Sequence, residues 1–354
     1  MVGHVSAEVR NAIQKFLSAR IAGARSVAVE NVVENTEGFS QETFTFDVLV
    51  ELASGSKERR SFVVKRKPRA GLLEPYDLEP EFRVLHALSG RGLLAPPTPW
   101  YEDDPGVLER PFYVMERLPG EVPIPAPNPD GSGPFDGPER DALAPQVAAE
   151  LARLHALDWR TLNLDFLAPL SDTSAARREL DRWRGRIERA EFAPDPMLEY
   201  ALAWLERHLP ADDELVLVHG DYRTGNFLVT RNGADSRLTG VLDWEMVHVG
   251  DPVEDLAWAV SRLWRAQGPY ACCLAEPAAL VQLYETARGR SVDPARLRFY
   301  EVLSAVKMLA IMLTGIRAFV DGRTTDLRMA IFDHQAPFLT ALIGVELGIV
   351  PEMS

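Results

Sequence analysis

Residues 219–226 read HGDYRTGN, and residues 241–245 read VLDWE. Together they supply a carboxylate at Asp221, an amide at Asn226 and a second carboxylate at Asp243. Apolar runs flank these segments, so the polar groups are expected at the ends of short strands. Phosphoryl transfer needs a cation that offsets the phosphate charge and a base that holds the acceptor hydroxyl, and Mg²⁺ prefers oxygen ligands. The pattern predicts this chemistry, with Asp221 orienting or deprotonating the hydroxyl and the other two residues holding the metal.

Three residues in or near this block also have structural explanations. His219 is favoured as a hydrogen-bonded scaffold residue over a proton carrier. Asp251 stands directly before a proline, which is the arrangement of a helix N-cap. Asp255, four positions later, either faces solvent or tethers the loop that carries Asp221.

The first part of the chain has the alternation typical of strands. Apolar and polar residues alternate between residues 44 and 50, and residues 61–66 form a second β-rich run. Helical spacing appears at 6–22 and 79–88. An antiparallel sheet with one internal helix is therefore expected before residue 118.

The remainder is expected to be mainly helical. Pro and Gly supply eleven of the twenty residues from 119 to 138, so neither a helix nor a central strand can continue through that segment. Helical spacing then recurs at 143–154, 174–191, 196–209, 252–265, 277–288, 294–319 and 324–346. The longest apolar run, at 302–316, carries Lys307, which favours a buried helix over a membrane span. The predicted parts are residues 1–118, 119–138 and 139–354.

The block from 219 to 257 resembles the aminoglycoside phosphotransferase-like (choline-kinase-like) family of the protein-kinase-like fold. HGDYRTGNFLV is similar to the family's catalytic loop, GVLDWE to its metal-binding loop, and GDPVEDLAW to the segment that follows. This combination looks closest to the branch associated with acyl-CoA dehydrogenases. The resemblance covers about residues 25–340. It implies an α+β, two-lobed fold with a nucleotide-binding lobe at 1–118, an interlobe segment at 119–138 and a catalytic and acceptor-binding lobe at 139–354.

The resemblance also implies roles for individual residues. Asp221 would be the catalytic base, and Asn226 and Asp243 the magnesium ligands. Arg223, two positions after the base, stands where protein kinases carry a lysine that contacts the transferred phosphate. Arg262, Arg265 and Arg317 are weaker candidates for binding an anionic acceptor, since a solvated helix face is the favoured explanation for them.

In the N-terminal lobe, the resemblance assigns ATP binding to a lysine and a glutamate. Lys65 follows an apolar β run, FVV, and would reach the phosphates. Arg66 and Lys67 are its rivals. Glu81 would form an ion pair with this lysine, and Glu79, which precedes a proline, is the alternative.

Two further segments complete the implied nucleotide site. Residues 35–43, NTEGFSQET, resemble the family's phosphate-covering turn, with Gly38 and Ser40 as cofactor-binding residues, although one glycine stands where two are common. A plain hairpin turn is the alternative. Glu116 and Leu118 lie where the interlobe hinge would pair its backbone with a purine edge.

Composition and charge exclude several classes. Asp and Glu outnumber Lys and Arg by 52 to 38, a net charge of −14, which argues against nucleic acid or an anionic membrane as partners. The two cysteines are adjacent, so no disulfide framework is expected. No signal-peptide pattern opens the chain, and a cytoplasmic location is expected. The sequence leaves the oligomeric state open.

The sequence as a whole predicts an ATP- and Mg²⁺-dependent kinase for a hydroxyl of a small-molecule acceptor. The acceptor could be aminoglycoside-like, hydroxyacyl-CoA-like or another metabolite. A nucleotide-binding pseudokinase is the alternative, and a metal-dependent phosphohydrolase using His219 and Asp221 is a third hypothesis. A hydrolase would ordinarily need more ligands close together.

Overall fold

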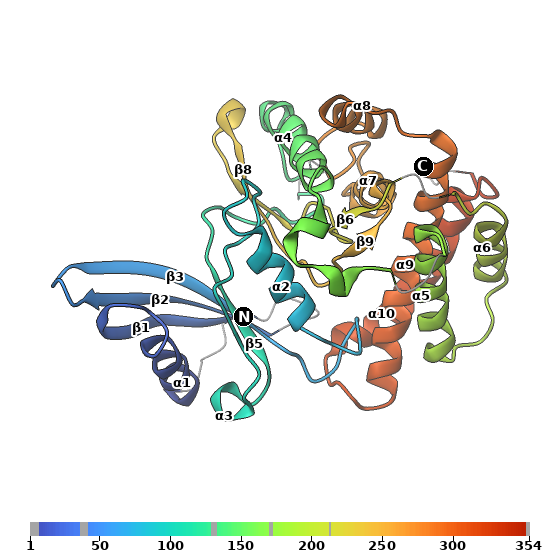
Figure 1. Ribbon diagram of the computed structural model, residues 1–354. Helices are drawn as coiled ribbons and strands as arrows, with labels where there is room; N and C mark the ends of the chain where they lie inside the picture. The colour runs from blue at the N-terminus through green and yellow to red at the C-terminus, as the bar shows by residue number, and fades with distance from the viewer. Residues whose placement is uncertain (1–6, 36–41, 129–132, 170–172, 212–213, 352–354) are drawn as a thin grey trace. The chain divides into compact units, whose positions relative to one another are not determined.

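The computed structural model describes residues 7–35, 42–128, 133–169, 173–211 and 214–351. The chain divides into two compact units (Figure 1). The first contains residues up to Arg91 together with Pro96–Leu118, and the second contains Gly92–Ala95 and the chain from Pro119 onward.

A five-stranded antiparallel sheet, in the order β1-β2-β3-β5-β4, forms the first unit. Its strands are β1 (Ala24–Asn35), β2 (Glu42–Leu52), β3 (Lys57–Arg66), β4 (Trp100–Glu102) and β5 (Phe112–Glu116). The helices of this unit are α1 (Ala7–Ser18), α2 (Glu79–Leu88) and the short α3 (Pro105–Leu108). The predicted sheet and both predicted helices are confirmed.

The alternation along β2 produces the core of this unit. Phe44, Phe46, Val48 and Val50 point to one face and are each at most 2% exposed. Helix α1 packs beside β1 (Figure 1) and adds its buried face to the same core. Burying one such side chain contributes about 1.5–3 kcal/mol, so these residues hold the sheet against its helix.

The second unit is mainly helical, as predicted. Its helices are α4 (Gly137–His155), α5 (Ala175–Ala190), α6 (Pro196–Arg207), α7 (Pro252–Val260), α8 (Pro277–Arg288), α9 (Pro294–Val320) and α10 (Leu327–Glu346). Short 3₁₀ turns lie at Trp159–Leu162, Asp165–Leu167, Gly233–Asp235 and Arg262–Trp264. The helix predicted to reach residue 265 ends at Val260, because Ser261 is extended, with φ −55° and ψ 147°. Its side chain instead caps the following turn.

Two small antiparallel pairs of strands interrupt these helices. β6 (Val216–Val218) pairs with β9 (His248–Gly250), and β7 (Phe227–Thr230) pairs with β8 (Arg237–Val241). β7 and β8 form a hairpin. β9 was not predicted, since three residues are too few to show alternation. These strands hold the loops that carry the candidate site.

The apolar helix α9 lies inside this unit. It is long and apolar enough to cross a membrane, but 72% of its most apolar window is buried within the protein. It contacts α5, α6, α7 and α10, and Figure 1 shows it running alongside α10. The prediction of a buried helix is confirmed.

The chain that enters the second unit is tied to the β7–β8 hairpin. Glu121 exchanges two backbone hydrogen bonds with Val229, at 3.0 and 2.9 Å. Thr239 Oγ1 donates to the carbonyl of Pro119 at 2.6 Å. Gly120 has a φ of 123°, and a Cβ there would lie 2.7 Å from the Thr239 hydroxyl. The start of the Pro/Gly-rich segment is therefore fixed against a strand of the second unit.

Candidate active site

The loop between β6 and β7, residues 219–226, brings two of the candidate residues into contact, and the β7–β8 ladder adds a third. Phe227 pairs with Val241, and the N–H of Leu242 donates to the carbonyl of Asn226 at 2.7 Å. Asp243 follows directly and adopts the left-handed conformation, with φ 67°. Because the start of β7 lies beside the end of β8, Asn226 and Asp243 are neighbours in space, although 16 residues separate them in the sequence.

The carboxylate of Asp221 accepts three hydrogen bonds. Its Oδ1 receives Trp258 Nε1 at 2.6 Å and Arg223 Nε at 2.8 Å, and its Oδ2 receives Asn226 Nδ2 at 2.6 Å. The residue is 8% exposed. An ionised carboxylate has about four acceptor positions, so these donors leave one position, on Oδ2, for a further hydroxyl.

The amide of Asn226 is oriented by the same contact. Its Nδ2 donates to the carbonyl of Asp221 at 2.9 Å as well as to the carboxylate. Because the nitrogen is fixed there, the amide oxygen points away from Asp221. That oxygen and the carboxylate of Asp243 are the donor types that Mg²⁺ prefers. The donor chemistry of this pair therefore fits a magnesium ion.

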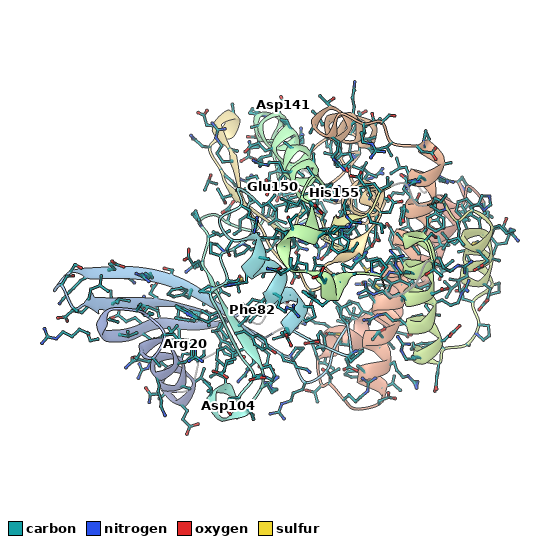
Figure 2. All side chains as sticks on the ribbon, viewed as in Figure 1. Arg20, Phe82, Asp104, Asp141, Glu150 and His155 are labelled. Atoms are coloured by element: carbon teal, nitrogen blue, oxygen red, sulfur yellow. The ribbon has the colours of Figure 1, made fainter. Side chains whose placement is uncertain are left out.

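Asp255, at 0% exposed, tethers the loop. Its Oδ2 accepts the N–H of His219 at 2.7 Å, and its Oδ1 accepts that of Gly220 at 2.8 Å. Burial would raise the pKa of Asp255, but a hydrogen bond from His155 and the backbone donors lower it. Figure 2 shows His155 on α4, where its other ring nitrogen meets Tyr284 at 2.7 Å. Of the two predicted alternatives for Asp255, the structure shows the tether.

His219 is a scaffold residue, as predicted. Its Nδ1 accepts the N–H of Asp221 at 3.1 Å, and its Nε2 faces the carbonyl of Leu242 at 3.0 Å. The first contact requires a bare Nδ1 and the second a protonated Nε2, so the ring is neutral. Burial lowers the pKa of His219, in agreement with that assignment. The imidazole thus links the two loops that carry Asp221 and Asp243.

Arg223 is held from three sides. Besides its bond to Asp221, it donates to the carbonyl of Thr224 at 3.2 Å, and its guanidinium lies 4.2 Å from the ring centre of Trp264. The side chain is 21% exposed. A positive group is thereby fixed beside the carboxylate.

Asp251 caps α7 through the N–H of Val253, as predicted.

In the first unit, Lys65 on β3 lies 3.5 Å from Glu81 on α2. Their side chains are 10% and 2% exposed. The rivals have other partners: Arg66 pairs with Glu42 at 2.5 Å, and the exposed Glu79 lies 3.8 Å from Arg83. The structure therefore distinguishes the buried pair Lys65 and Glu81 from its neighbours.

The other residues predicted to bind the nucleotide are Glu116, Leu118, Gly38 and Ser40. The backbone N–H of Glu116 donates to the carbonyl of Pro97 at 2.8 Å. Leu118 is the last residue of the first unit. Gly38 and Ser40 lie outside the described residues.

Two contributors to the site were not predicted. The N–H bond from Trp258 to Asp221 has no local sequence signal. Lys307, from α9, donates to the carbonyl of Gly220 at 2.6 Å. A charged residue inside an apolar helical run was the available sign of an unusual role for Lys307.

The chain is similar in sequence and in fold to several known proteins. Acyl-CoA dehydrogenase family member 11 of Gallus gallus is 31% identical over 270 residues, which are 72% of this chain and 34% of that protein. A crystal structure described as a candidate aminoglycoside phosphotransferase of Ralstonia eutropha JMP134 has a TM-score of 0.71 at 22% identity, covering 97% of this chain and 99% of that one. The GDP complex of aminoglycoside 2′-phosphotransferase-IIIa has a TM-score of 0.59 at 18% identity, covering 96% and 98%.

The chain spans 22% to 38% of the length of the curated relatives that it matches first. A family model described as "Phosphotransferase enzyme family" matches residues 34–300. The predicted fold and enzyme class are thereby confirmed. Because the match covers more than half of the chain, the protein belongs to the phosphotransferase enzyme family and has its protein-kinase-like fold.

Proposed function

We propose that the protein transfers the γ-phosphate of ATP to a hydroxyl group of a small molecule, with Asp221 as the base. The observation that carries this proposal is the carboxylate of Asp221, which three donors orient and which keeps one acceptor position on Oδ2. A hydroxyl that donates to Oδ2 has its oxygen lone pairs directed away from the carboxylate, as attack on phosphorus requires.

The transfer reaction involves the acceptor hydroxyl, the γ-phosphate of ATP and the carboxylate of Asp221. The hydroxyl oxygen forms the new bond to the γ-phosphorus, the bond from that phosphorus to the bridging oxygen breaks, and ADP leaves. The hydroxyl proton passes to Oδ2 of Asp221 and then to solvent. General-base assistance of this kind contributes about 10²- to 10⁴-fold in rate.

Asn226 and Asp243 would hold magnesium in this proposal. The bound ion would offset the negative charge of the phosphates. The protein's own contribution is to fix the two ligands: Asp221 orients the amide of Asn226, and the hydrogen bond from Leu242 keeps the start of the Asp243 loop beside it.

The other predicted residues take supporting roles. Lys65 would contact the nucleotide phosphates, and its ion pair with Glu81 would keep the ammonium oriented. Gly38 and Ser40 would donate backbone N–H groups to the phosphates. The carbonyl of Glu116 and the backbone of Leu118 would pair with the purine. Arg223 donates to Asp221 through Nε, and its guanidinium would also contact the transferred phosphate.

The family supports a small-molecule acceptor, and the names of the relatives offer candidate classes for it. The two solved structures compared above are named for aminoglycosides, while curated relatives include proteins named as acyl-CoA dehydrogenase family members. Aminoglycosides and hydroxyacyl-CoA esters both carry hydroxyl groups. Arg262, one of the candidate anion ligands, already lies 3.2 Å from Glu346, so its positive charge is partly offset within the protein.

A transfer assay separates the hypotheses. The protein is incubated with Mg²⁺ and γ-labelled ATP in the presence of hydroxyacyl-CoA esters, aminoglycosides or other hydroxylated metabolites. The proposal expects acceptor-dependent transfer of label in at least one class. Tight ATP binding without transfer would indicate a pseudokinase, and release of phosphate from monoesters without ATP would indicate a hydrolase; either result would overturn the proposal.

A further inference from the structure

A lysine is buried beside the loop that carries Asp221. Lys307 lies on α9, and its side chain is 3% exposed. Its Nζ donates to the carbonyl of Gly220 at 2.6 Å and lies 3.3 Å from Oε1 of Glu254 on α7. Burying an ammonium group is costly unless hydrogen bonds and opposite charge replace its water. These two contacts supply that replacement.

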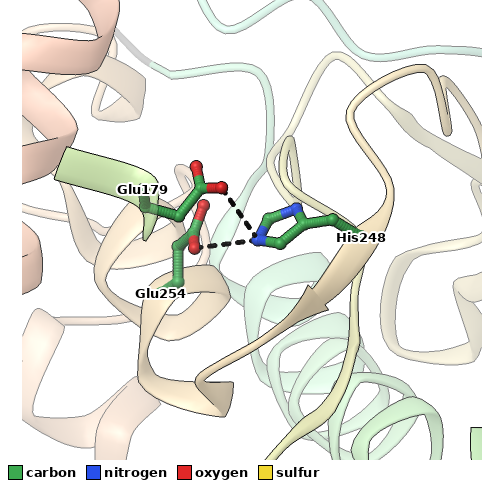
Figure 3. Close-up of side chains that lie close together, drawn as sticks. All are labelled: Glu179, His248 and Glu254. Atoms are coloured by element: carbon green, nitrogen blue, oxygen red, sulfur yellow. Dashed lines mark hydrogen bonds and ion pairs between the residues drawn. The ribbon is translucent and has the colours of Figure 1, made fainter. Parts of the chain in front are cut away.

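Glu254 belongs to a compact cluster of charges with Glu179 and His248 (Figure 3). His248 Nε2 lies 3.6 Å from Glu179 and 3.1 Å from Glu254. Its Nδ1 faces the carbonyl of Met246 at 2.9 Å. Both ring nitrogens therefore face acceptors, and the ring is a cation. Burial alone would lower the pKa of His248, but the two carboxylates outweigh it and raise the pKa to about 9.

The spacing of these three side chains, with ligand atoms within 4.8 Å of one another, would suit a metal ion. Their negative charges are already offset, however, because the two carboxylates face the cations His248 and Lys307. A third cation, Arg182, lies 3.3 Å from Glu179. The proton on Nε2 also occupies the position through which the imidazole would bind a metal. The cluster is an ion-pair network that anchors Lys307.

The carbonyl that Lys307 holds belongs to a constrained backbone position. Gly220 has a φ of 84°, and a Cβ there would lie 2.6 Å from a neighbouring backbone oxygen. Its N–H is held by Asp255 at 2.8 Å, and the next N–H, that of Asp221, is held by His219 at 3.1 Å. The peptide group before Asp221 is thus fixed on both sides, with a charged donor on its oxygen.

Lys307 also contacts the indole that holds the carboxylate. Its Nζ lies 4.5 Å from the ring centre of Trp258, the same side chain whose N–H donates to Asp221 at 2.6 Å. We propose that Lys307 is a positioning residue, which fixes the Gly220 carbonyl and the Trp258 ring and thereby aligns the carboxylate of Asp221. This inference rests on the proposed role of Asp221 as the base.

The test compares Lys307→Met with Leu309→Ala, a control for lost core packing on the same helix, since Leu309 is 3% exposed. Lys307→Met removes the charged donor and keeps a chain of similar length. It is expected to lower kcat roughly tenfold or more, with the KM for ATP nearly unchanged. Leu309→Ala is expected to lower the melting temperature with kcat within about twofold.

Two readouts separate positioning from general destabilisation. In an Asp221→Asn background, Lys307→Met is expected to cause no further loss of kcat, because the group it aligns is gone. Hydrogen exchange of the peptide covering residues 219–226 is expected to accelerate in Lys307→Met and to stay unchanged in Leu309→Ala. This second readout does not depend on turnover, so it tests the inference even if wild-type protein transfers no phosphate and the proposed function fails.

Unchanged exchange at 219–226 in Lys307→Met would overturn the inference, as would additive losses of kcat in the double variant. Lys307→Gln, which keeps an uncharged donor, replaces Lys307→Met if the latter does not fold. It is expected to lower kcat at least threefold with faster exchange at 219–226, and wild-type values for both would contradict the proposal.

Discussion

Trp258→Phe tests how the site orients Asp221. The change removes the indole N–H that donates to Oδ1 at 2.6 Å and keeps an aromatic ring in the same buried place. A hydrogen bond to a charged group contributes about 1.5–3 kcal/mol. Because Arg223 and Asn226 still hold the carboxylate, we expect the lower part of that range, about 1.5–2 kcal/mol. This corresponds to a roughly 10- to 30-fold loss of kcat.

The KM for ATP is expected to stay within about twofold, since the lost bond lies on the base and not on Asn226 or Asp243. Steady-state kinetics with the acceptor found in the transfer screen provide the measurement. Trp159→Phe is the matched control: Trp159 is 4% exposed, and its N–H donates to the carbonyl of Leu215 at 3.2 Å. If Trp258→Phe kept wild-type kcat, or if both variants lost kcat equally, the role assigned to the indole would be refuted.

Three further predictions concern other parts of the structure. Asp243→Ala should raise both the Mg²⁺ concentration for half-maximal activity and the KM for ATP, measured by magnesium titration, and an unchanged Mg²⁺ requirement would count against it as a ligand. Lys65→Met should raise the KM for ATP about tenfold or more through loss of a charged phosphate contact, and unchanged nucleotide binding by calorimetry would reject that contact. His248, whose pKa is raised from 6.5 to about 9 by Glu179 and Glu254 against the opposing effect of burial, should stabilise the fold fully below pH 6.5 and lose this contribution, about 3 kcal/mol, as the pH rises through 9. Urea unfolding should show that loss in wild type and a flatter profile in His248→Gln; parallel profiles would contradict it.

Much of the fold was predictable because its long elements have strong periodicity. The helices at 79–88 and 277–288 begin and end where their apolar spacing predicts. Periodicity failed where an element is too short to repeat, as at the three-residue strand His248–Gly250. It also failed where local capping stopped a pattern, as at Ser261, which ends a helix expected to continue to residue 265.

The residues of the candidate site also fall into those that the sequence predicted and those that it did not. Asp221 and Asn226 lie in one loop, and a single hairpin brings Asp243 to them, so a short stretch of sequence was sufficient to propose them together. Trp258 and Lys307 were not predicted, because they reach the loop from helices 37 and 87 residues away. Such contacts depend on how helices pack, which the spacing of apolar residues does not specify.

The central claim is that Asp221 acts as the base in phosphoryl transfer. Asp221→Asn keeps the size of the side chain and removes its capacity to take a proton. With γ-labelled ATP, Mg²⁺ and a saturating acceptor, single-turnover transfer should fall by about 10²- to 10⁴-fold, while the affinity for ATP stays close to that of wild type. Transfer at the wild-type rate by this variant would contradict the account.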